Sequence, residues 1–223
     1  MARLSSNASG NAGEAAFNAF FLRAGLKVAK PYWTEDMNDL LVLYDNGTRL
    51  IAIPIQVKSV QKKKDDEEKI QRLWKRYLEK TKYLCLAIYC PDLDKLWFIP
   101  KADNIVKAYK EWASKPAKTK PRKKYDEIDS DKGEVPLRVN VTQNGDEEFD
   151  KKWLLNTDDV YGIVQQINIL ANEIQQDKDY SHSVGFSYIG QGSSSISRAQ
   201  SAECTIERFD DDDEDIGLNL EDE

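Results

Sequence analysis

The spacing of apolar residues predicts helices in four parts of the chain, namely 13–24, 65–82, 100–113 and 157–176. In the first, Phe17, Phe20 and Phe21 recur at i, i+3 and i+4, which puts them on one helical face, and Gly25 is a typical residue just beyond a helix end. The last begins at Thr157, which we expect to act as N-cap before two aspartates in the first turn. The segment 65–82 is rich in charged residues, and its apolar residues recur at helical spacing. These apolar residues are Ile70, Leu73, Trp74, Tyr77 and Leu78.

Denser apolar runs predict strands at 26–30, 40–44, 49–59, 83–89, 95–99 and 137–141. Asn46 and Gly47 supply the positive φ that a tight turn needs, so 40–44 and 49–59 form a predicted hairpin. The turn 91–94 predicts a second hairpin, and Pro54 favours an edge position or a bulge within its strand. This order of elements predicts a mixed sheet flanked by helices, of class α/β or α+β.

Composition divides the chain into four segments. Residues 1–12 are small and polar and are expected to be disordered, 13–113 form the predicted core, 114–180 form a basic loop and a helical extension, and 181–223 combine a Ser/Gly linker with an acidic tail that we also expect to be disordered.

The charge of the chain is unevenly distributed. A net charge of −7 argues against nucleic acid as a partner, but residues 203–223 alone carry −10, which leaves +3 for the remainder. The segment 101–124 carries +7 and is a candidate for sequence-independent phosphate contact, with a solvated linker as the alternative. The candidate residues within it are Lys118, Lys120, Arg122, Lys123 and Lys124.

Several protein classes are excluded by composition. The chain has no apolar run of about 18 residues, so no membrane span is expected, and its N-terminus lacks the apolar region of a secretory signal. Three cysteines without ligand-like spacing suit a reducing cytoplasm, and Cys85 and Cys90 are predicted to be packing residues. A single histidine, His182, rules out zinc sites built on several histidines.

Four polar residues have positions that suggest chemistry. Asp39 opens one strand of the first hairpin, and Gln56 and Lys58 lie two apart near the end of the other, so both point to one face. Antiparallel pairing brings Asp39 beside them, while Glu14 lies on the opening helix. Carboxylate and amide oxygens suit Mg²⁺, and an ammonium beside them suits a phosphodiester. Each residue also has a purely structural reading: a strand cap for Asp39, a solvated strand end for Lys58, and a helix-dipole partner for Glu14.

The ordered set of Glu14 in GEAAF, Asp39 in NDLLVLYDNG, IQVKS and the later YLCLAIYCPDLDKLWFIP resembles the PD-(D/E)xK nuclease superfamily, and most closely its small prokaryotic endonuclease-like members with a QxK motif. The resemblance covers roughly 13–113. It implies a restriction-endonuclease-like core, with Asp39 as main metal ligand, Gln56 as second ligand, Lys58 as catalytic lysine and Glu14 as accessory acid near Mg²⁺ or Mn²⁺. In two departures, Asn38 replaces the motif proline and Gln56 replaces an acid, which lowers the negative charge of the site.

The predicted function is a metal-dependent DNA endonuclease. The alternatives are a catalytically inactive module of the same fold that binds DNA or protein, and an adaptor acting through its tail. A homodimer stays open. Three readings of the tail remain: a solubilising end, a site for a basic partner protein, or an occupant of the protein's own basic cleft.

Overall fold

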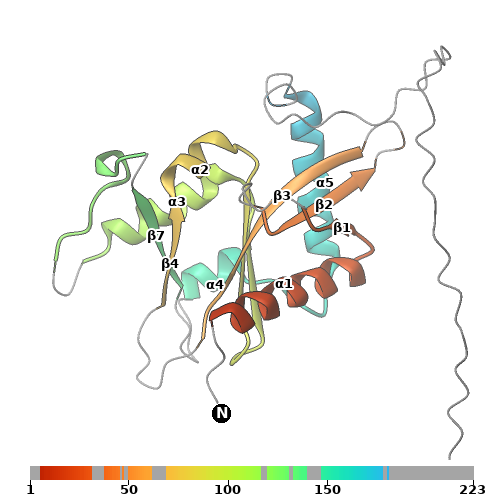
Figure 1. Ribbon diagram of the computed structural model, residues 1–223, viewed down its shortest axis with the longest axis horizontal. Coiled ribbons are helices and arrows are strands. Elements are labelled where there is room, and N and C mark those ends of the chain that lie inside the picture. The colour runs from red at the N-terminus through yellow and green to blue at the C-terminus, as the bar shows by residue number, and fades with distance from the viewer. Residues whose placement is uncertain are drawn as a thin grey trace, which may run out of the picture. The chain divides into compact units, whose positions relative to one another are not determined.

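The computed structural model describes residues 6–31, 38–45, 47, 50–61, 69–116, 120–130, 133–139, 147–177 and 180, all within one compact unit. Its elements, shown in Figure 1, are α1 (Ser6–Arg23), β1 (Lys27–Ala29), β2 (Leu40–Asp45), β3 (Leu50–Ser59), β4 (Lys69–Trp74), α2 (Lys75–Lys80), β5 (Cys85–Cys90), β6 (Lys95–Ile99), α3 (Ala102–Ser114), a 3₁₀ turn (Tyr125–Glu127), β7 (Glu134–Val139), α4 (Glu147–Trp153) and α5 (Tyr161–Gln176). The predicted linker and acidic tail lie outside the described residues.

The predicted mixed sheet is confirmed. Its strand order is β1-β2-β3-β5-β6, with β3 antiparallel to β2 and parallel to β5. Both predicted hairpins are present, since β2 pairs with β3 from Leu40↔Ile55 to Asp45↔Leu50 and β5 pairs with β6. Gly47 has a φ of 83° in the first turn, which is the conformation that favours glycine there.

Side chains alternate between the two faces of the sheet along each strand, and both faces are buried. One face presents Ile51, Ile53 and Ile55 of β3 to a core that includes residues of α1 and α5. The other face presents Leu86 and Ile88 of β5 to a core shared with α3, β4 and β7. Figure 1 accordingly shows α1 and α5 beside β2 and β3, and α2, α3, β4 and β7 in the other half of the ribbon.

Pro54 lies within the central strand β3, so the prediction of an edge strand or a bulge is wrong. Its register is continuous, because Leu41 pairs with Pro54 next to the Leu40↔Ile55 pair. The carbonyl of Ile55 accepts the N–H of Asp39 on the β2 side, so the nitrogen of Pro54 faces the β5 side. There the pairing starts only at Ile55↔Cys85, and the missing N–H of the proline costs no ladder hydrogen bond.

The helix predicted over 65–82 is wrong. Within the described part of this segment, Lys69–Trp74 forms β4, which pairs with β7, and only Lys75–Lys80 is helical. The pairing aligns Leu73 with Val135, and both side chains are buried in the second core. A cross-strand partner more than 60 residues away outweighs the local helical spacing, which is how tertiary packing overrides propensity.

Several element boundaries differ from the predicted ones. Residues 6–12 belong to α1 rather than to a frayed terminus, and β7 (Glu134–Val139) begins three residues before the predicted 137, while 140 and 141 lie outside the described residues. Helix α5 begins at Tyr161 with Val160 as its N-cap, so the predicted start at Thr157 with two aspartates in the first turn is wrong; Oδ1 of Asp159 accepts the N–H of Tyr161 at 2.9 Å.

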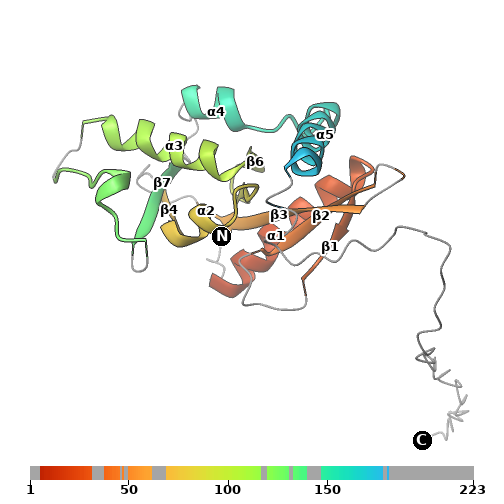
Figure 2. The ribbon, with the colours of Figure 1, turned by 90° about the horizontal axis from the view of Figure 1, so that it is seen from above.

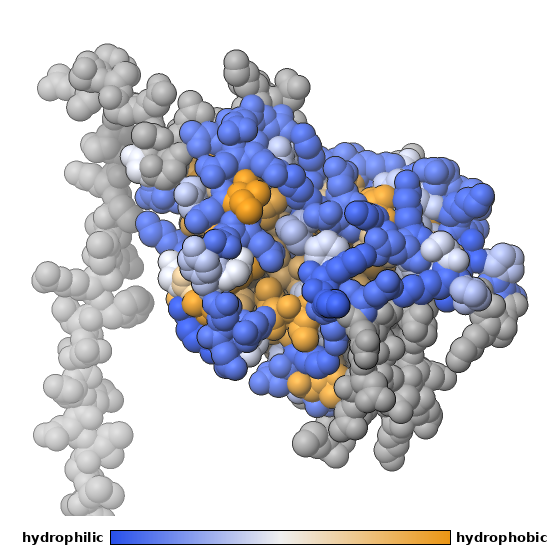
Figure 3. Space-filling view, turned by 180° about the vertical axis from the view of Figure 1, so that it is seen from behind, coloured by the Kyte–Doolittle hydropathy of each residue, from blue (hydrophilic) through white to orange (hydrophobic). Residues whose placement is uncertain are grey.

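Helix α4 was not predicted. Its Asp150 accepts a hydrogen bond from the indole Nε1 of Trp97, at 2.7 Å, and its Lys152 pairs with Glu111 of α3 at 2.9 Å. Figure 2 shows α3 and α4 together on one side of the sheet. The surface seen in Figure 3 is mainly hydrophilic, with apolar side chains in patches interrupted by polar ones.

Candidate functional site

The candidate site lies where β2 begins and β3 ends. Asp39 directly precedes β2, and its N–H donates to the carbonyl of Ile55 at 2.9 Å. The β2–β3 ladder ends at the Leu40↔Ile55 pair, and this hydrogen bond holds Asp39 directly beyond that pair, within reach of Gln56. The hairpin therefore brings these two side chains together, as the sequence predicted from antiparallel pairing alone.

Asp39 and Gln56 are joined by a hydrogen bond. Gln56, only 7% exposed, donates from Nε2 to Oδ2 of Asp39, and the N–H of Val57 donates to the same oxygen at 2.6 Å. Within the described part of the chain, Oδ1 of Asp39 and Oε1 of Gln56 accept no hydrogen bond. One carboxylate oxygen thus fixes the side chain to β3, while two acceptor oxygens keep their coordinating capacity.

The surroundings of Asp39 act on its acidity in opposite directions. Burial raises the pKa of this carboxyl above its ordinary value, and the negative charge of Glu14 raises it further. The hydrogen bond from Val57 and the positive charges of Lys58 and Lys30 lower it. Lys58, half-buried and on the same face of β3 as Gln56, thus acts on Asp39 through its charge.

Glu14 reaches the site from α1 and carries a partner that the sequence did not reveal. Lys30, directly after β1, has its Nζ 2.6 Å from Oε2 of Glu14. This bond is the main reason that the pKa of Lys30 is raised. Only the pairing of β1 with β2 brings Lys30 to this end of the sheet, so no local motif could have identified it.

A glycine sets the distance between α1 and the end of β3. A Cβ added to Gly13 would overlap Oγ of Ser59 and lie 3.3 Å from Cγ1 of Val57. The Oγ of Ser59 is itself buried without a hydrogen-bond partner in the described structure. Gly13 therefore permits the close approach that carries Glu14 to the neighbourhood of Asp39.

These side chains fit a hard divalent cation. No group of three or more His, Cys, Asp and Glu side chains that could hold a metal ion occurs among the described residues. Mg²⁺, however, keeps several waters and needs only one or two carboxylates with another oxygen. Asp39, Glu14 and the amide oxygen of Gln56 are the groups that could hold such a cation, and it would relieve the repulsion between the two carboxylates.

In the basic segment after α3, Arg122, a predicted phosphate contact, is bound to its own chain. Its Nη1 donates to the carbonyls of Trp112 and Lys115, the latter at 3.0 Å, and its guanidinium lies 4.3 Å from the centroid of the Trp112 ring. Arg122 therefore fastens the loop to the end of α3. Lys120, Lys123 and Lys124 are exposed, as phosphate contact requires, and Lys118 lies outside the described residues.

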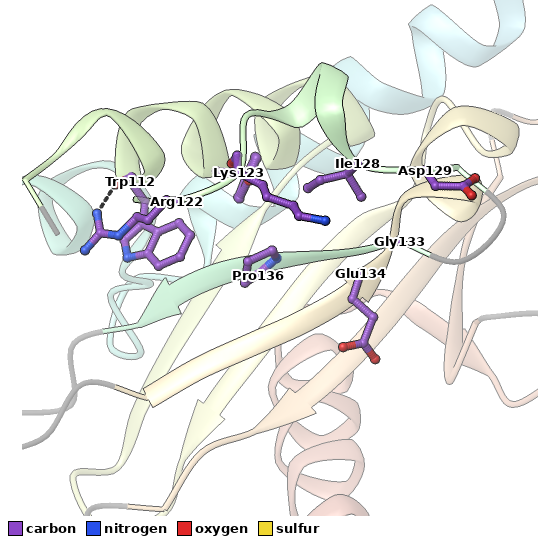
Figure 4. A pocket seen from close by; sticks show the side chains of 9 residues that line it. Trp112, Arg122, Lys123, Ile128, Asp129, Gly133, Glu134 and Pro136 are labelled. Carbon is purple, nitrogen blue, oxygen red and sulfur yellow. Dashed lines mark hydrogen bonds between the residues drawn. The ribbon is translucent and has the colours of Figure 1, made fainter. Parts of the chain in front are cut away.

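A pocket of about 450 Å³ lies beside this loop, between α3 and β7 (Figure 4). Figure 4 shows Lys123 extending along it and Arg122 bonded to the Trp112 backbone. Its lining residues are Tyr109, Trp112, Arg122, Lys123, Ile128, Asp129, Gly133, Glu134 and Pro136. It shares no residue with the Asp39 site.

Cys85 and Cys90 are buried, as predicted for packing residues. Burial raises the pKa of the Cys85 thiol to about 12, so it stays protonated at neutral pH. Among the described helices, none is long and apolar enough to cross a membrane.

Comparison with known proteins gives limited similarity. The chain matches no established protein family and no curated protein. Among solved structures, it is similar to a bacterial homing endonuclease, I-Ssp6803I, with a TM-score of 0.33 and 19% identity over 44% of this chain and 70% of that one. The described residues form a mixed α/β fold.

Proposed function

We propose that the protein is a metal-dependent nuclease that hydrolyses phosphodiester bonds of DNA at the Asp39 site, on a restriction-endonuclease-like core. The observation that supports this most is the convergence of Asp39 with Gln56 and, through their charges, with Lys58 and Glu14. Three separate elements, α1, β2 and β3, supply these groups to one end of the sheet. A strand cap or a solvated lysine alone would not require all of them there.

The roles follow from the chemistry of each group. Asp39, Glu14 and the amide oxygen of Gln56 would hold Mg²⁺ or Mn²⁺. When bound, such a cation supplies charge neutralisation at the scissile phosphate and makes an attacking water more acidic. Lys58 orients that water and stabilises the negative charge that develops on the phosphoryl oxygens. In the reaction, the water oxygen forms a bond to phosphorus and loses a proton, and the leaving oxygen takes the other P–O bond pair and a proton.

DNA is the proposed substrate because the chain outside its acidic end is positively charged and presents exposed lysines. Outside the segment 203–223, the chain has a net charge of +3. Lys120, Lys123 and Lys124 are exposed on the loop after α3. Phosphate contacts of this kind position a nucleic acid without reading its sequence.

A catalytically inactive DNA-binding module is the second candidate, and one observation favours it. Gln56 brings no negative charge to the site, and Lys30 already neutralises Glu14. Both features lower the affinity for a cation. This module would bind DNA equally well with and without divalent ions.

A cleavage assay with Mg²⁺ or Mn²⁺ on plasmid, linear and branched DNA separates the two candidates. The nuclease predicts cleavage that is abolished by Asp39→Asn. Asp45→Asn is the matched control, because Asp45 ends the same strand and is paired with Lys27 away from the site. Binding without cutting, unchanged by Asp39→Asn, would establish the inactive module instead.

A further inference from the structure

Lys30 occupies an unusual place for a lysine beside a candidate metal site. It directly follows β1, an outer strand of the sheet, and lies just beyond the Ala29↔Leu41 pair that ends the β1–β2 ladder. This is the end of the ladder at which Asp39 precedes β2. Two positive charges act on the Asp39 carboxylate, that of Lys30 from directly after β1 and that of Lys58 from β3.

The two lysines differ in how firmly they are held. Lys58 belongs to β3, which is hydrogen-bonded on both sides to neighbouring strands, and it is half-buried. Lys30 has 69% of its side chain exposed, while its partner Glu14 has only 23% exposed. The ammonium of Lys30 therefore covers the carboxylate from the solvent side, and its long side chain can leave that position without disturbing the core.

The charges at the site balance only when no divalent cation is present. Asp39 and Glu14 contribute two negative charges, and Lys30 and Lys58 contribute two positive ones. A divalent cation between the carboxylates adds two positive charges and repels both lysines. A phosphate of the DNA backbone brings negative charge to the same place, and Lys30 is the cation free to move toward it.

We propose that Lys30 is an exchangeable counter-ion: it neutralises Glu14 when no divalent cation is bound, and it transfers to a backbone phosphate when a cation takes Glu14. This inference rests on the proposed function and adds a positioning residue to the same site. The exchange makes metal binding and DNA binding cooperative. A bound cation releases Lys30 to contact a phosphate, and a phosphate that holds Lys30 leaves Glu14 available to the cation.

Lys27 provides a matched control within the same strand. It begins β1, is 68% exposed, and pairs with Asp45 at 3.7 Å, in the same kind of exposed ion pair. It lies at the other end of β1 from Lys30. A general effect of removing one positive charge from the protein would appear equally in Lys27→Met and Lys30→Met.

The first measurement is the dissociation constant for Mn²⁺, obtained from the electron paramagnetic resonance signal of the free ion with the full-length protein. Lys30→Met is expected to tighten Mn²⁺ binding roughly two- to fivefold, the range given by exposed ion pairs, while Lys27→Met leaves it unchanged. A damaged fold would weaken binding instead. In a Glu14→Gln background, Lys30→Met should have no further effect, because the carboxylate for which the two cations compete has been removed.

The second measurement is the salt dependence of binding to a DNA duplex, made in a Lys58→Met background so that the DNA stays intact. With Mn²⁺ present, Lys30→Met should reduce the slope of log K against log salt by about 0.9, the loss of one phosphate contact. Without Mn²⁺ the slope should not change. Lys30→Gln repeats both measurements with a polar side chain in case the methionine variant folds poorly.

The outcomes separate this inference from the function on which it rests. If the wild-type protein cuts DNA and binds Mn²⁺, but Lys30→Met and Lys30→Gln bind Mn²⁺ no more tightly, the exchange is wrong and the nuclease stands. If the wild-type protein neither binds Mn²⁺ nor cuts DNA, both proposals fail. Tighter Mn²⁺ binding together with a reduced slope supports the exchange.

Discussion

The end of the β2–β3 hairpin and the loop after α3 both contain charged residues that the sequence marks as functional candidates. These charged residues have different contacts in the structure. At the hairpin end, Asp39 is fixed through one oxygen, and its other oxygen accepts no hydrogen bond from the described residues. In the loop, the guanidinium of Arg122 is bound to carbonyls of its own chain. A candidate site is thus recognised by coordinating capacity that the fold holds in place but leaves unused, rather than by the number of charges.

The largest expected effect contrasts a lysine of the hairpin with a lysine of the loop. Lys58→Met should reduce the cleavage rate by about 10²- to 10⁴-fold, since it removes a group acting directly on the reacting atoms. Lys123→Met should reduce DNA affinity at low salt and leave the rate at saturating DNA unchanged. Single-turnover kinetics on a plasmid substrate measure both, and equal effects on the rate would erase the distinction between the two regions.

The second effect tests the close approach of α1 to β3. Gly13→Ala should lower the free energy of unfolding by about 1–3 kcal/mol and slow cleavage, because its methyl group would push Glu14 away from Asp39. Gly10→Ala is the control on the same helix: nothing lies within 4 Å of its added Cβ, and it should stabilise the helix by up to about 1 kcal/mol. Urea unfolding and a cleavage assay compare the two variants. Equal stability and equal cleavage rates would show that α1 accommodates a methyl group at Gly13 without moving Glu14.

The third effect tests the assignment of Arg122 to stability. Arg122→Met removes hydrogen bonds to two backbone carbonyls and should lower the free energy of unfolding by about 1–3 kcal/mol. Lys120→Met, an exposed change in the same loop, should leave stability unchanged and weaken DNA binding. Thermal unfolding and a binding titration give the comparison, and an unchanged melting temperature for Arg122→Met would return this residue to the phosphate-contact group.

The smallest effect is in the pH dependence of stability. The pKa of Asp39 is raised in the folded state, so its ionisation opposes folding, and that cost appears as the pH rises through the unfolded and then the folded pKa. Asp39→Asn should therefore raise the melting temperature near neutral pH and lose this advantage in acid.

The ionisation of Asp177 affects stability in the opposite direction. Hydrogen bonds from Lys82 and Tyr83 lower the pKa of Asp177 to about 2, so its ionised form stabilises the fold above the unfolded pKa. Asp177→Asn should lower the melting temperature near neutral pH, with the difference fading as the pH falls toward 2. Melting curves between acid and neutral pH compare the two variants, and parallel trends would contradict the assigned environments.

Local patterns predicted the parts of the structure that depend on neighbouring residues. The hairpin and its Asn-Gly turn follow from short-range periodicity, and antiparallel geometry then suffices to bring Asp39 to Gln56. Residues placed by distant pairing were not accessible in this way. The β4–β7 pairing was missed because β4 has apolar residues at helical spacing and its partner lies more than 60 residues later in the chain. Lys30 comes close to Glu14 only through the β1–β2 ladder.

Strand β3 contributes one face to the core and the other to the candidate site, which makes the site sensitive to the register of the hairpin. Its odd-numbered residues fill the core, while Gln56 and Lys58 face the candidate site. A shift of one residue in the pairing of β2 and β3 would turn Ile55 and Val57 to the face that Gln56 and Lys58 occupy and withdraw both polar side chains from the site at once. Correct pairing of the hairpin and assembly of the candidate site are therefore one event, and a molecule that has misaligned this hairpin lacks the site.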